Sequence, residues 1–402
     1  MNREQLKEMV LQGELQTPSY FFDVENLYLH VDKMQAVTRG KVGLCYAMKA
    51  NPFLISPLSK KIEKIEVCSP GELEICKKNR IAPSQIIFSG VNKTKENINA
   101  ALDYGVKVIT LESMKHWRLL KEVCDEDNYS GVEILPRLSN GLQFGMNEEE
   151  IMDIAEETVG SSQFHFMGIH YFSGTQKKKL VKFEEELVML DELLQRISNG
   201  LGLQNLTLEY GAGLAVPYFE GEDFDSIYAN LYALVGKIVD IQKESSVSYT
   251  AVLELGRFFA FSCGTYITKV DDVKINQTHP YIIVDGGIHQ LNYYGQNMAM
   301  RVPQMELLRK TPCENEDITT MTVCGSLCTM ADVLVRKWKG SIPDENDCFL
   351  FYNAGAYSVT EAPALFLSRT LPQIYFYSAE NGLSVQRPFF ESYEWNSVKK
   401  AL

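Results

Sequence analysis

The chain alternates eight short apolar runs with helix-like stretches, and this alternation limits its fold more than any other feature. Each run has the apolar composition of a buried strand. The runs are Val42–Tyr46, Ile65–Cys68, Ile86–Phe88, Val106–Leu111, Val132–Leu138, Phe166–Phe172, Leu206–Tyr210 and Thr250–Leu255. Strands that alternate with helices pair in parallel, so eight such units predict a closed (β/α)8 or TIM barrel. An open doubly wound sheet is the alternative, but no run resembles an edge strand, which favours the barrel.

Two of the intervening stretches show helical signals most clearly. Apolar residues recur every three or four positions from Leu180 to Ile197, which places them on one helix face. Asn147 is followed by Glu148, Glu149 and Glu150. An N-cap residue type followed by acidic residues is typical of a helix N-terminus, because the carboxylates complement the helix dipole there.

The pattern changes after Cys263, where strand-like runs follow one another with turn residues and little helical pattern between them. These runs are Tyr266–Val270, Tyr281–Val284, Met321–Val323, Val333–Val335 and Phe349–Tyr352. They predict a second, all-β domain. We therefore expect a barrel over residues 25–263 and a β domain over residues 264–402. Residues 1–24, which include an extended segment at Thr17–Phe22, are expected to dock on the β domain.

Charge and cysteine content exclude several classes of protein. A net charge of -13 argues against nonspecific binding to nucleic acid or to an anionic membrane. No apolar run approaches the length of a membrane span, and the N-terminus lacks the apolar core of a secretory signal. The nine cysteines are scattered without a Cys-x-x-Cys pair, so neither a disulfide framework nor a metal site is expected. The simplest location is a reducing cytoplasm.

Chemically capable residues stand at the ends of the predicted barrel strands, where barrel enzymes carry their active sites. Each has an ordinary explanation taken alone: a snorkelling lysine, a core histidine, a tight glycine turn or a structural Glu–Arg pair. Together, one ligand with a phosphate, a ring and a carbonyl carbon explains them better. The residues are Lys49, Arg137, His170, Ser173, the loop Gly211, Ala212 and Gly213, and the group Glu254, Gly256 and Arg257.

Pyridoxal 5'-phosphate (PLP) has these features. A lysine amine forms a Schiff base with its aldehyde. Glycine-rich backbone and an arginine hold its phosphate. A carboxylate facing the ring nitrogen keeps that nitrogen protonated, so that the ring can accept electrons from the substrate α-carbon.

The order and spacing of several motifs give the chain a specific resemblance. From about Thr17 to about Ile374 it resembles the PLP-dependent decarboxylases of the alanine-racemase fold, the family of diaminopimelate, ornithine and arginine decarboxylases. The matching blocks are Tyr46–Asn51, Cys68–Leu73, Gly168–His170 with Ser173-Gly174, Gly211–Gly213, Glu254–Arg257, Val284–Gly287, Cys324–Cys328 and Gly355–Tyr357.

This resemblance implies a role for each matched residue. Lys49 is expected to form the Schiff base, His170 to stack on the cofactor ring, and Glu254 to face the pyridine nitrogen. Cys328 is expected to be the catalytic proton donor, lent across a homodimer interface to the partner's site. The expected cofactor contacts are Arg137, Ser173, Gly211, Ala212, Gly213, Gly256, Arg257 and Tyr357, and the expected substrate contacts are His289, Thr329 and Tyr357.

Two departures from diaminopimelate decarboxylases bear on the substrate. Those enzymes carry an acidic residue directly after the cysteine that matches Cys328, where this chain has Thr329. They also carry an arginine shortly after the Asp-Gly-Gly loop, which is Asp285-Gly286-Gly287 here. This chain has the stretch His289–Gln296 at that place and no arginine before Arg301. At these positions the chain is similar to a subgroup of the family that includes the carrier-linked glutamate decarboxylase of butirosin biosynthesis. A carboxyl group masked as a thioester needs no charged partner.

The sequence therefore predicts a PLP-dependent amino-acid α-decarboxylase, with a side-chain-masked or carrier-linked amino acid as a candidate substrate. Diaminopimelate decarboxylase is the main alternative. An amino-acid racemase of the same fold and a noncatalytic homologue are the others; Cys328 argues against the racemase, and Lys49, Glu254 and Cys328 together argue against the noncatalytic protein.

Overall fold

The computed structural model describes residues 3–294, 299–311 and 317–399. The chain divides into two compact units. We call the unit of residues 30–216 and 224–259 the barrel unit, and the unit of residues 1–29, 217–223 and 260–402 the β unit.

Eight parallel strands form a closed ring in the barrel unit. The ring closes because β10 pairs with β2 and β5 pairs with β6. Each strand overlaps one predicted apolar run, so the barrel is confirmed and the open sheet is wrong. The strands are β2 (Gly43–Ala47), β3 (Lys64–Val67), β4 (Ile86–Phe88), β5 (Val108–Leu111), β6 (Val132–Leu138), β8 (Gly168–Phe172), β9 (Leu206–Gly211) and β10 (Tyr249–Leu255).

The run Phe166–Phe172 is not one strand, as predicted, but the parts of two. A short strand, β7 (Phe164–Phe166), pairs with the start of β6, and β8 begins at Gly168. A Cβ atom at Gly168 would lie 1.8 Å from the carbonyl oxygen of Thr207, so only glycine allows the close approach of β8 to β9 at this point.

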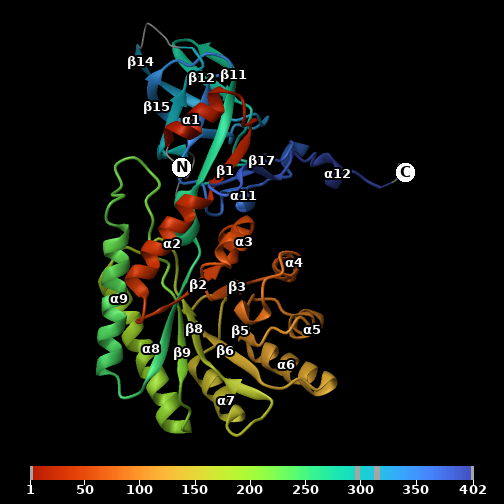
Figure 1. The fold of residues 1–402 in the computed structure, drawn as a ribbon, viewed down its shortest axis with the longest axis vertical. Helices are drawn as coiled ribbons and strands as arrows, with labels where there is room; N and C mark the ends of the chain where they lie inside the picture. Colours follow the sequence, from red (N-terminus) through yellow and green to blue (C-terminus); the bar gives the residue numbers. More distant parts are fainter. Residues whose placement is uncertain (1–2, 295–298, 312–316, 400–402) are drawn as a thin grey trace. The chain divides into compact units, whose positions relative to one another are not determined.

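Helices surround the strands of the barrel unit, as Figure 1 shows for α4 to α9. Asn147 caps α7 through a capping box with Glu150, as its sequence signal predicts. Helix α8 continues past the predicted Ile197 to Leu201, and Gly202 ends it in the left-handed conformation. The helices are α2 (Val24–Thr38), which spans both units, α3 (Ile55–Leu58), α4 (Pro70–Lys78), α5 (Lys95–Asp103), α6 (Met114–Asp127), α7 (Glu148–Thr158), α8 (Leu180–Leu201), α9 (Ile227–Glu244) and α10 (Arg257–Ala260).

The β unit is built on a mixed sheet of nine strands. The N-terminal strand β1 lies inside it, antiparallel to β11 and parallel to β17. The five predicted runs overlap β11, β12, β14, β15 and β16, whereas β13, β17 and β18 were not predicted. The strands are β1 (Ser19–Asp23), β11 (Gly264–Asn276), β12 (His279–Val284), β13 (Met305–Leu308), β14 (Ile318–Cys324), β15 (Val333–Ser341), β16 (Cys348–Phe351), β17 (Gln373–Ser378) and β18 (Gly382–Arg387).

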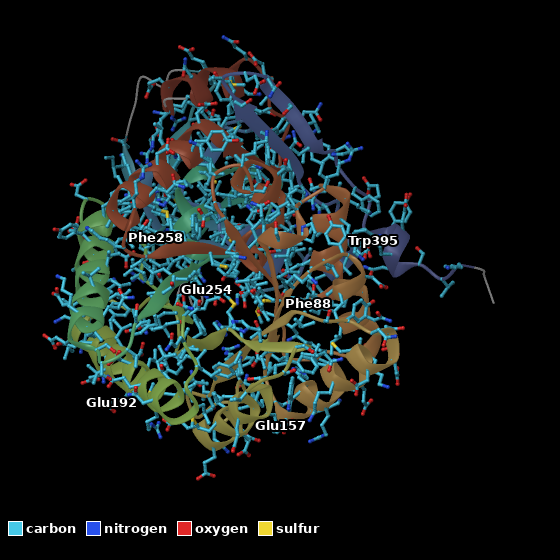
Figure 2. All side chains as sticks on the ribbon, turned by 60° about the horizontal axis from the view of Figure 1, so that its bottom comes forward. Phe88, Glu157, Glu192, Glu254, Phe258 and Trp395 are labelled. Carbon is cyan, nitrogen blue, oxygen red and sulfur yellow. The ribbon has the colours of Figure 1, made fainter. Side chains whose placement is uncertain are left out.

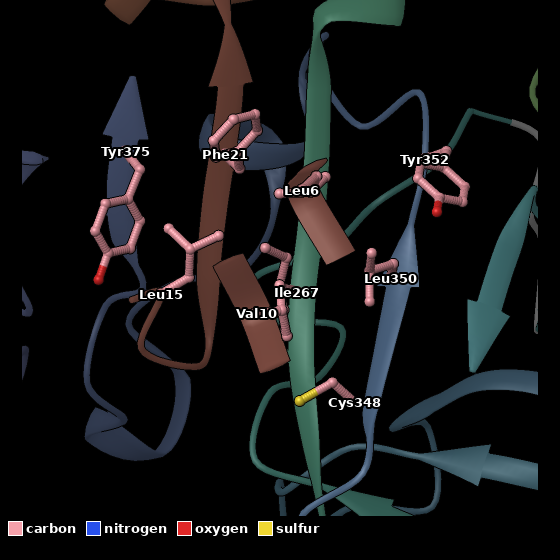
Figure 3. Packing of buried hydrophobic residues seen from close by; sticks show 9 residues of the cluster. All are labelled: Leu6, Val10, Leu15, Phe21, Ile267, Cys348, Leu350, Tyr352 and Tyr375. Atoms are coloured by element: carbon pink, nitrogen blue, oxygen red, sulfur yellow. The ribbon is translucent and has the colours of Figure 1, made fainter. Parts of the chain in front are cut away.

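Helix α1 (Arg3–Leu11) packs on this sheet and contributes to its core. Its buried residues Leu6 and Val10 join Phe21 of β1, Ile267 of β11 and Leu350 of β16 in one apolar cluster (Figure 3). Burial of such side chains contributes about 1.5–3 kcal/mol each. The N-terminal segment is therefore an integral part of the β unit.

The remaining elements are single turns, and none of the described helices is long and apolar enough to cross a membrane. The short elements are η1 (Met48–Ala50), η2 (Pro52–Leu54), η3 (Pro83–Gln85), η4 (Phe261–Cys263), α11 (Ser358–Glu361), η6 (Phe366–Ser368) and α12 (Tyr393–Asn396).

Candidate active site

Lys49 lies in the turn η1, directly after β2, with its amine near two carboxylates. Its Nζ is 3.4 Å from Glu66 Oε2 and 3.9 Å from Glu254 Oε1. The lysine side chain is 42 % exposed, whereas both glutamates are 4 % exposed. Its neighbours Met48 and Ala50 are fully buried and fix the turn. The amine is thus accessible at the carboxyl end of the barrel while its position is held by the core.

His170 and Glu254 form a buried pair inside the barrel. Nε2 of His170 lies 2.8 Å from Oε2 of Glu254, and Nδ1 has no hydrogen-bond partner among the described residues. Burial favours a neutral Glu254, but the Lys49 ammonium and the hydrogen bond from His170 outweigh it and hold its pKa well below the usual range. Burial likewise opposes protonation of His170, yet Glu254 raises its pKa above the ordinary value. Glu254 is therefore a buried, ionised carboxylate, and Figure 2 shows it inside the ring of helices.

Two further buried glutamates surround this pair, and the sequence analysis missed both. Burial and the neighbouring charge of Glu254 raise the pKa of Glu66. Burial, Glu254 and Glu66 raise the pKa of Glu209 to about 7, although His170 acts in the opposite direction. Each residue interrupts an apolar strand, β3 or β9, and a lone acid in a core strand is a signal that could have identified them.

Glu66, His170 and Glu254 also have the spacing of metal ligands, since their ligand atoms lie within 4.8 Å of one another. No metal site was expected from the sequence. The Lys49 ammonium lies beside both carboxylates, so its positive charge balances part of their negative charge.

The predicted glycine loop lies against the segment that follows β8. A Cβ atom at Gly213 would lie 1.7 Å from the carbonyl oxygen of Gly174, and Gly213 has a φ of +58°. Gly211 is constrained less severely, because its Cβ would lie 2.7 Å from the Phe172 ring, a side chain rather than backbone. Between them, Ala212 is fully buried. The loop is thus a close-packed backbone surface with the small residues that anion binding requires.

Ser173 and Arg257 stand on either side of this loop in the sequence. Ser173 is half-buried and Arg257, the first residue of α10 after Gly256, is buried. The Ser173 hydroxyl donates to Glu186 Oε1 at 2.6 Å, a contact that the sequence analysis did not identify.

Arg137, at the end of β6, is held by a buried ion pair. Its Nη1 donates to Glu112 Oε1 at 2.9 Å, and the backbone N–H of Gly145 donates to the other oxygen of Glu112 at 2.9 Å. The guanidinium also lies 4.8 Å from the centre of the Phe144 ring. Glu112, which the sequence analysis missed, therefore fixes both Arg137 and the loop after β6.

The β unit holds the remaining predicted site residues. Cys328 is exposed and Thr329 half-buried, in a loop between β14 and β15. Asp332 fixes this loop, because it accepts from Leu327 N at 2.7 Å and from Ile288 N at 2.8 Å. The second bond joins the Cys328 loop to the Asp-Gly-Gly loop.

His289 and Tyr357 lie in the same unit. His289 is 1 % exposed, and neither ring nitrogen has a hydrogen-bond partner in the described part of the chain. Burial, with Arg369 nearby, lowers the pKa of His289 to about 4. Tyr357 has a φ of +65° immediately before α11, an uncommon backbone conformation that often accompanies a functional position. Of the predicted stretch 289–296, residues 295 and 296 lie outside the described residues.

The barrel residues fit PLP in chemistry. An accessible amine, an ionised buried carboxylate, an imidazole and a glycine loop that a Cβ atom would fill are gathered in one unit. These are the groups that a phosphorylated aldehyde with a basic ring nitrogen requires.

Comparison with known proteins agrees with this chemistry. Residues 24–261 match the family described as pyridoxal-dependent decarboxylase, pyridoxal binding domain. The L-glutamyl-(BtrI acyl-carrier protein) decarboxylase of Niallia circulans is 25% identical over 393 residues, covering 92% of this chain and 91% of the relative. The 2-((L-alanin-3-ylcarbamoyl)methyl)-2-hydroxybutanedioate decarboxylase of Staphylococcus aureus is 26% identical over 383 residues, covering 89% and 93%.

Diaminopimelate decarboxylases are similar in both sequence and fold. The Campylobacter jejuni enzyme is 24% identical over 378 residues and covers 89% of each chain. The crystal structure of the M. jannaschii enzyme in complex with L-lysine has a TM-score of 0.86 at 19% identity, covering 98% of this chain and 94% of the other. The predicted fold, cofactor and enzyme class are thereby confirmed: the chain belongs to the pyridoxal-dependent decarboxylases and is a PLP-dependent amino-acid carboxy-lyase.

Proposed function

We propose that this enzyme removes the α-carboxylate of an amino acid whose distal carboxyl group is masked, as a thioester on a carrier protein or as a similar acyl derivative. The proposal rests on one observation. In diaminopimelate decarboxylases, charged residues at two positions bind the charged distal end of the substrate, and this chain has no charged side chain available for that purpose at these positions. Thr329 replaces the acid after the cysteine. Arg301, the first arginine after the Asp-Gly-Gly loop, is engaged by Glu222 at 2.8 Å and stacks 3.8 Å from the Phe219 ring centre.

The environment of His289 supports an uncharged substrate end. Its lowered pKa keeps the imidazole neutral at physiological pH. The adjacent Gln290 is held by Tyr266, whose hydroxyl donates to it at 2.7 Å, and by the carbonyl of Thr370, which accepts from it at 2.9 Å. Neutral donors and acceptors suit a thioester or amide better than a carboxylate, since a buried carboxylate needs a compensating charge.

Two relatives have names that point to substrates of this kind. One acts on L-glutamyl acyl-carrier protein and the other on an alanine derivative joined through a carbamoyl group. In both names the amino acid is part of an acyl linkage rather than free.

The barrel residues have the following proposed roles. Bound PLP supplies an aldehyde for the substrate amine and a ring that accepts the electrons left when carbon dioxide departs. Lys49 provides the amine that holds the cofactor and later releases the product. Glu254 stays ionised and keeps a proton on the ring nitrogen that it faces. His170 packs on the ring and positions Glu254 through their hydrogen bond.

The phosphate is proposed to lie against the glycine loop. Backbone N–H groups around Gly211, Ala212 and Gly213 donate to it, together with the Ser173 hydroxyl. Arg257, beside Gly256, contributes positive charge, and Tyr357 donates a further hydrogen bond. Arg137, fixed by Glu112, borders the cofactor.

We also assign Cys328 as the group that protonates the α-carbon after decarboxylation. Its exposure, together with Met330 at 97 % exposed in the same loop, supports an arrangement in which this loop enters the active site of a second subunit. The proposed assembly is a homodimer with shared active sites.

A reducing compartment is proposed for the enzyme, with the cytoplasm as the simplest choice. The eight cysteines in the described part of the chain are all free, and exposed thiols such as Cys328 persist in such a compartment.

Free diaminopimelate is the second candidate substrate, favoured by the similarity to diaminopimelate decarboxylases. Carbon dioxide release from four carboxyl-labelled compounds separates the two: L-glutamyl acyl-carrier protein, L-glutamyl pantetheine, free L-glutamate and free meso-diaminopimelate. We expect the thioesters to exceed the free acids in kcat/KM by about 100-fold. Rapid turnover of free diaminopimelate would contradict the masked-substrate proposal and establish the alternative.

A further inference from the structure

Lys177 lies in a compact polar cluster beside the glycine loop. Its Nζ is 2.7 Å from Ser173 Oγ and 2.6 Å from Glu186 Oε2, and it lies 3.3 Å from the Tyr210 hydroxyl. Tyr210 in turn donates to Glu186. The Lys177 and Glu186 side chains are only 15 % and 16 % exposed, so the ion pair is shielded from solvent. We call these four residues the Ser173 cluster.

The backbone of Lys177 is joined to the same loop. Its N–H donates to the Gly213 carbonyl at 2.9 Å, and its carbonyl accepts from Ala215 N at 3.1 Å. The preceding Gln176 binds both backbone groups of Val216, donating at 3.0 Å and accepting at 2.8 Å. Segment 173–177 and the glycine loop therefore form one rigid surface.

The hydrogen-bond chemistry of the cluster determines what Ser173 can do. An ammonium only donates, so the Ser173 oxygen accepts from Lys177, and the single hydroxyl proton must go to another acceptor. In this structure that acceptor is Glu186, at 2.6 Å. A phosphate oxygen on the loop is an equivalent acceptor, while Lys177 and Tyr210 continue to satisfy Glu186.

The charges of the cluster also favour a phosphate beside it. Burial lowers the pKa of Lys177, and Glu186 opposes this shift, so the carboxylate helps to retain the ammonium. Within the cluster Glu186 balances Lys177, and the arrival of a phosphate adds negative charge beside a cation that is shielded from solvent. In such a place electrostatic attraction is much stronger than in water.

We infer that Lys177 is a positioning residue for the cofactor phosphate: it orients the Ser173 hydroxyl toward the phosphate and provides a cation in addition to Arg257. This inference rests on the proposed placement of the phosphate at the glycine loop, but not on the proposed substrate.

The test compares two ligands that differ only by the phosphate. Apoprotein of the wild type, Lys177→Met and Lys177→Arg is titrated with PLP and with pyridoxal, and Kd is measured by the absorbance change on binding. Lys179→Met is the matched control, because Lys179 is an exposed lysine two residues away. The melting temperature of each apoprotein reports whether it is folded.

We expect Lys177→Met to weaken PLP binding by about 10- to 100-fold, with pyridoxal binding changed less than threefold. Lys177→Arg should recover most of the loss, and Lys179→Met should bind both ligands as the wild type does. If Lys177→Met gives little folded protein, Lys177→Gln carries the test, since it keeps a hydrogen-bond donor but removes the charge.

Equal loss of PLP and pyridoxal binding would overturn the inference and show a general structural role. Unchanged PLP affinity in a folded charge-free variant would also overturn it. Neither result bears on decarboxylation, whereas a wild-type holoenzyme that releases no carbon dioxide from any amino acid tested would contradict the proposed function alone.

Discussion

His170 Nε2 lies 2.8 Å from Glu254 Oε2, and both side chains are almost fully buried inside the barrel. A buried carboxylate remains ionised only where neighbouring groups favour its charge, and here His170 and Lys49 do so. The barrel therefore holds a fixed negative charge, and its proposed role is to face the ring nitrogen of PLP. This relationship explains why a glutamate inside an apolar strand is compatible with a stable fold.

Removing the charge of Glu254 should impair catalysis more than cofactor binding. We expect Glu254→Gln to lower kcat by about 100- to 1,000-fold, because the amide does not keep a proton on the ring nitrogen, while the enzyme still binds PLP. Steady-state kinetics and absorbance titration measure the two effects. Glu192→Gln is the control, since Glu192 is exposed on α8, outside the ring of helices (Figure 2). A kcat for Glu254→Gln within threefold of the wild type would show that Glu254 does not face the ring nitrogen.

Glu209 should make the stability of the apoprotein depend on pH. Its pKa is about 7 in the folded state, against about 4.3 in an unfolded chain. Between these values the folded state binds the additional proton, so stability is greatest at low pH and falls as pH rises toward 7. Glu209→Gln removes this dependence. Relative to the wild type, the free energy of unfolding of the variant should rise by about 2–3 kcal/mol between pH 5 and pH 8.

Urea unfolding at several pH values measures this difference. Cys45 does not disturb the comparison, because burial, the largest cause, raises the pKa of its thiol well above the ordinary value, and the folded protein keeps it protonated from pH 5 to pH 8 with or without Glu209. A stability difference between Glu209→Gln and the wild type that stayed constant from pH 5 to pH 8 would contradict the raised pKa.

Gly213 tests the packing of the proposed phosphate loop. A methyl group there would meet the Gly174 carbonyl at 1.7 Å with a φ of +58°. Gly213→Ala should therefore lower stability by about 2–4 kcal/mol and weaken PLP binding at least tenfold. Gly200→Ala is the contrasting substitution, since Gly200 lies in α8 with no atom within 4 Å of the added Cβ. It should raise stability by about 0.5–1 kcal/mol. If thermal unfolding showed equal effects of the two substitutions, the loop would be less closely packed than described.

Most of the barrel and about half of the β unit could be predicted from sequence. The eight buried strands are apolar on both faces, so continuous apolar runs identified them. Strands β18 and β13 were not predicted because neither has a fully buried residue, and so neither forms a continuous apolar run. Helix α1 buries only Leu6 and Val10, too few for a clear helical pattern.

The residues of the site also divide into some that could be predicted from the sequence and some that could not. Lys49, His170 and Glu254 could be predicted because they follow or end apolar runs and occur in specific motifs. Glu112 and Glu186 could not, because their roles depend on partners such as Arg137 and Lys177, which only the fold brings into contact with them. The partner of a charged residue is a property of the folded chain.

Cys328 should affect the fate of the α-carbon rather than the binding of the cofactor. We expect Cys328→Ala to bind PLP as the wild type does but to lower kcat by about 100-fold or more, and to alter product composition. Mass spectrometry of products formed in deuterated water detects such a change. Cys324→Ala is the control, since Cys324 lies four residues earlier, at the end of β14, and has no proposed role. Wild-type turnover with unchanged products in Cys328→Ala would exclude this thiol as the proton donor.

Among the lysines near the carboxyl end of the barrel, Lys49 is the one proposed to bind the cofactor covalently. Borohydride reduction of the holoenzyme followed by peptide mass spectrometry tests this directly, because reduction makes the lysine–cofactor bond permanent. The competing amines are Lys93, which is buried and whose pKa burial lowers to about 8, and the half-buried Lys177. We predict a phosphopyridoxyl group on the peptide containing Lys49 and its loss in Lys49→Ala. A phosphopyridoxyl group on Lys93 or Lys177 instead, or covalent cofactor retained in Lys49→Ala, would contradict the account.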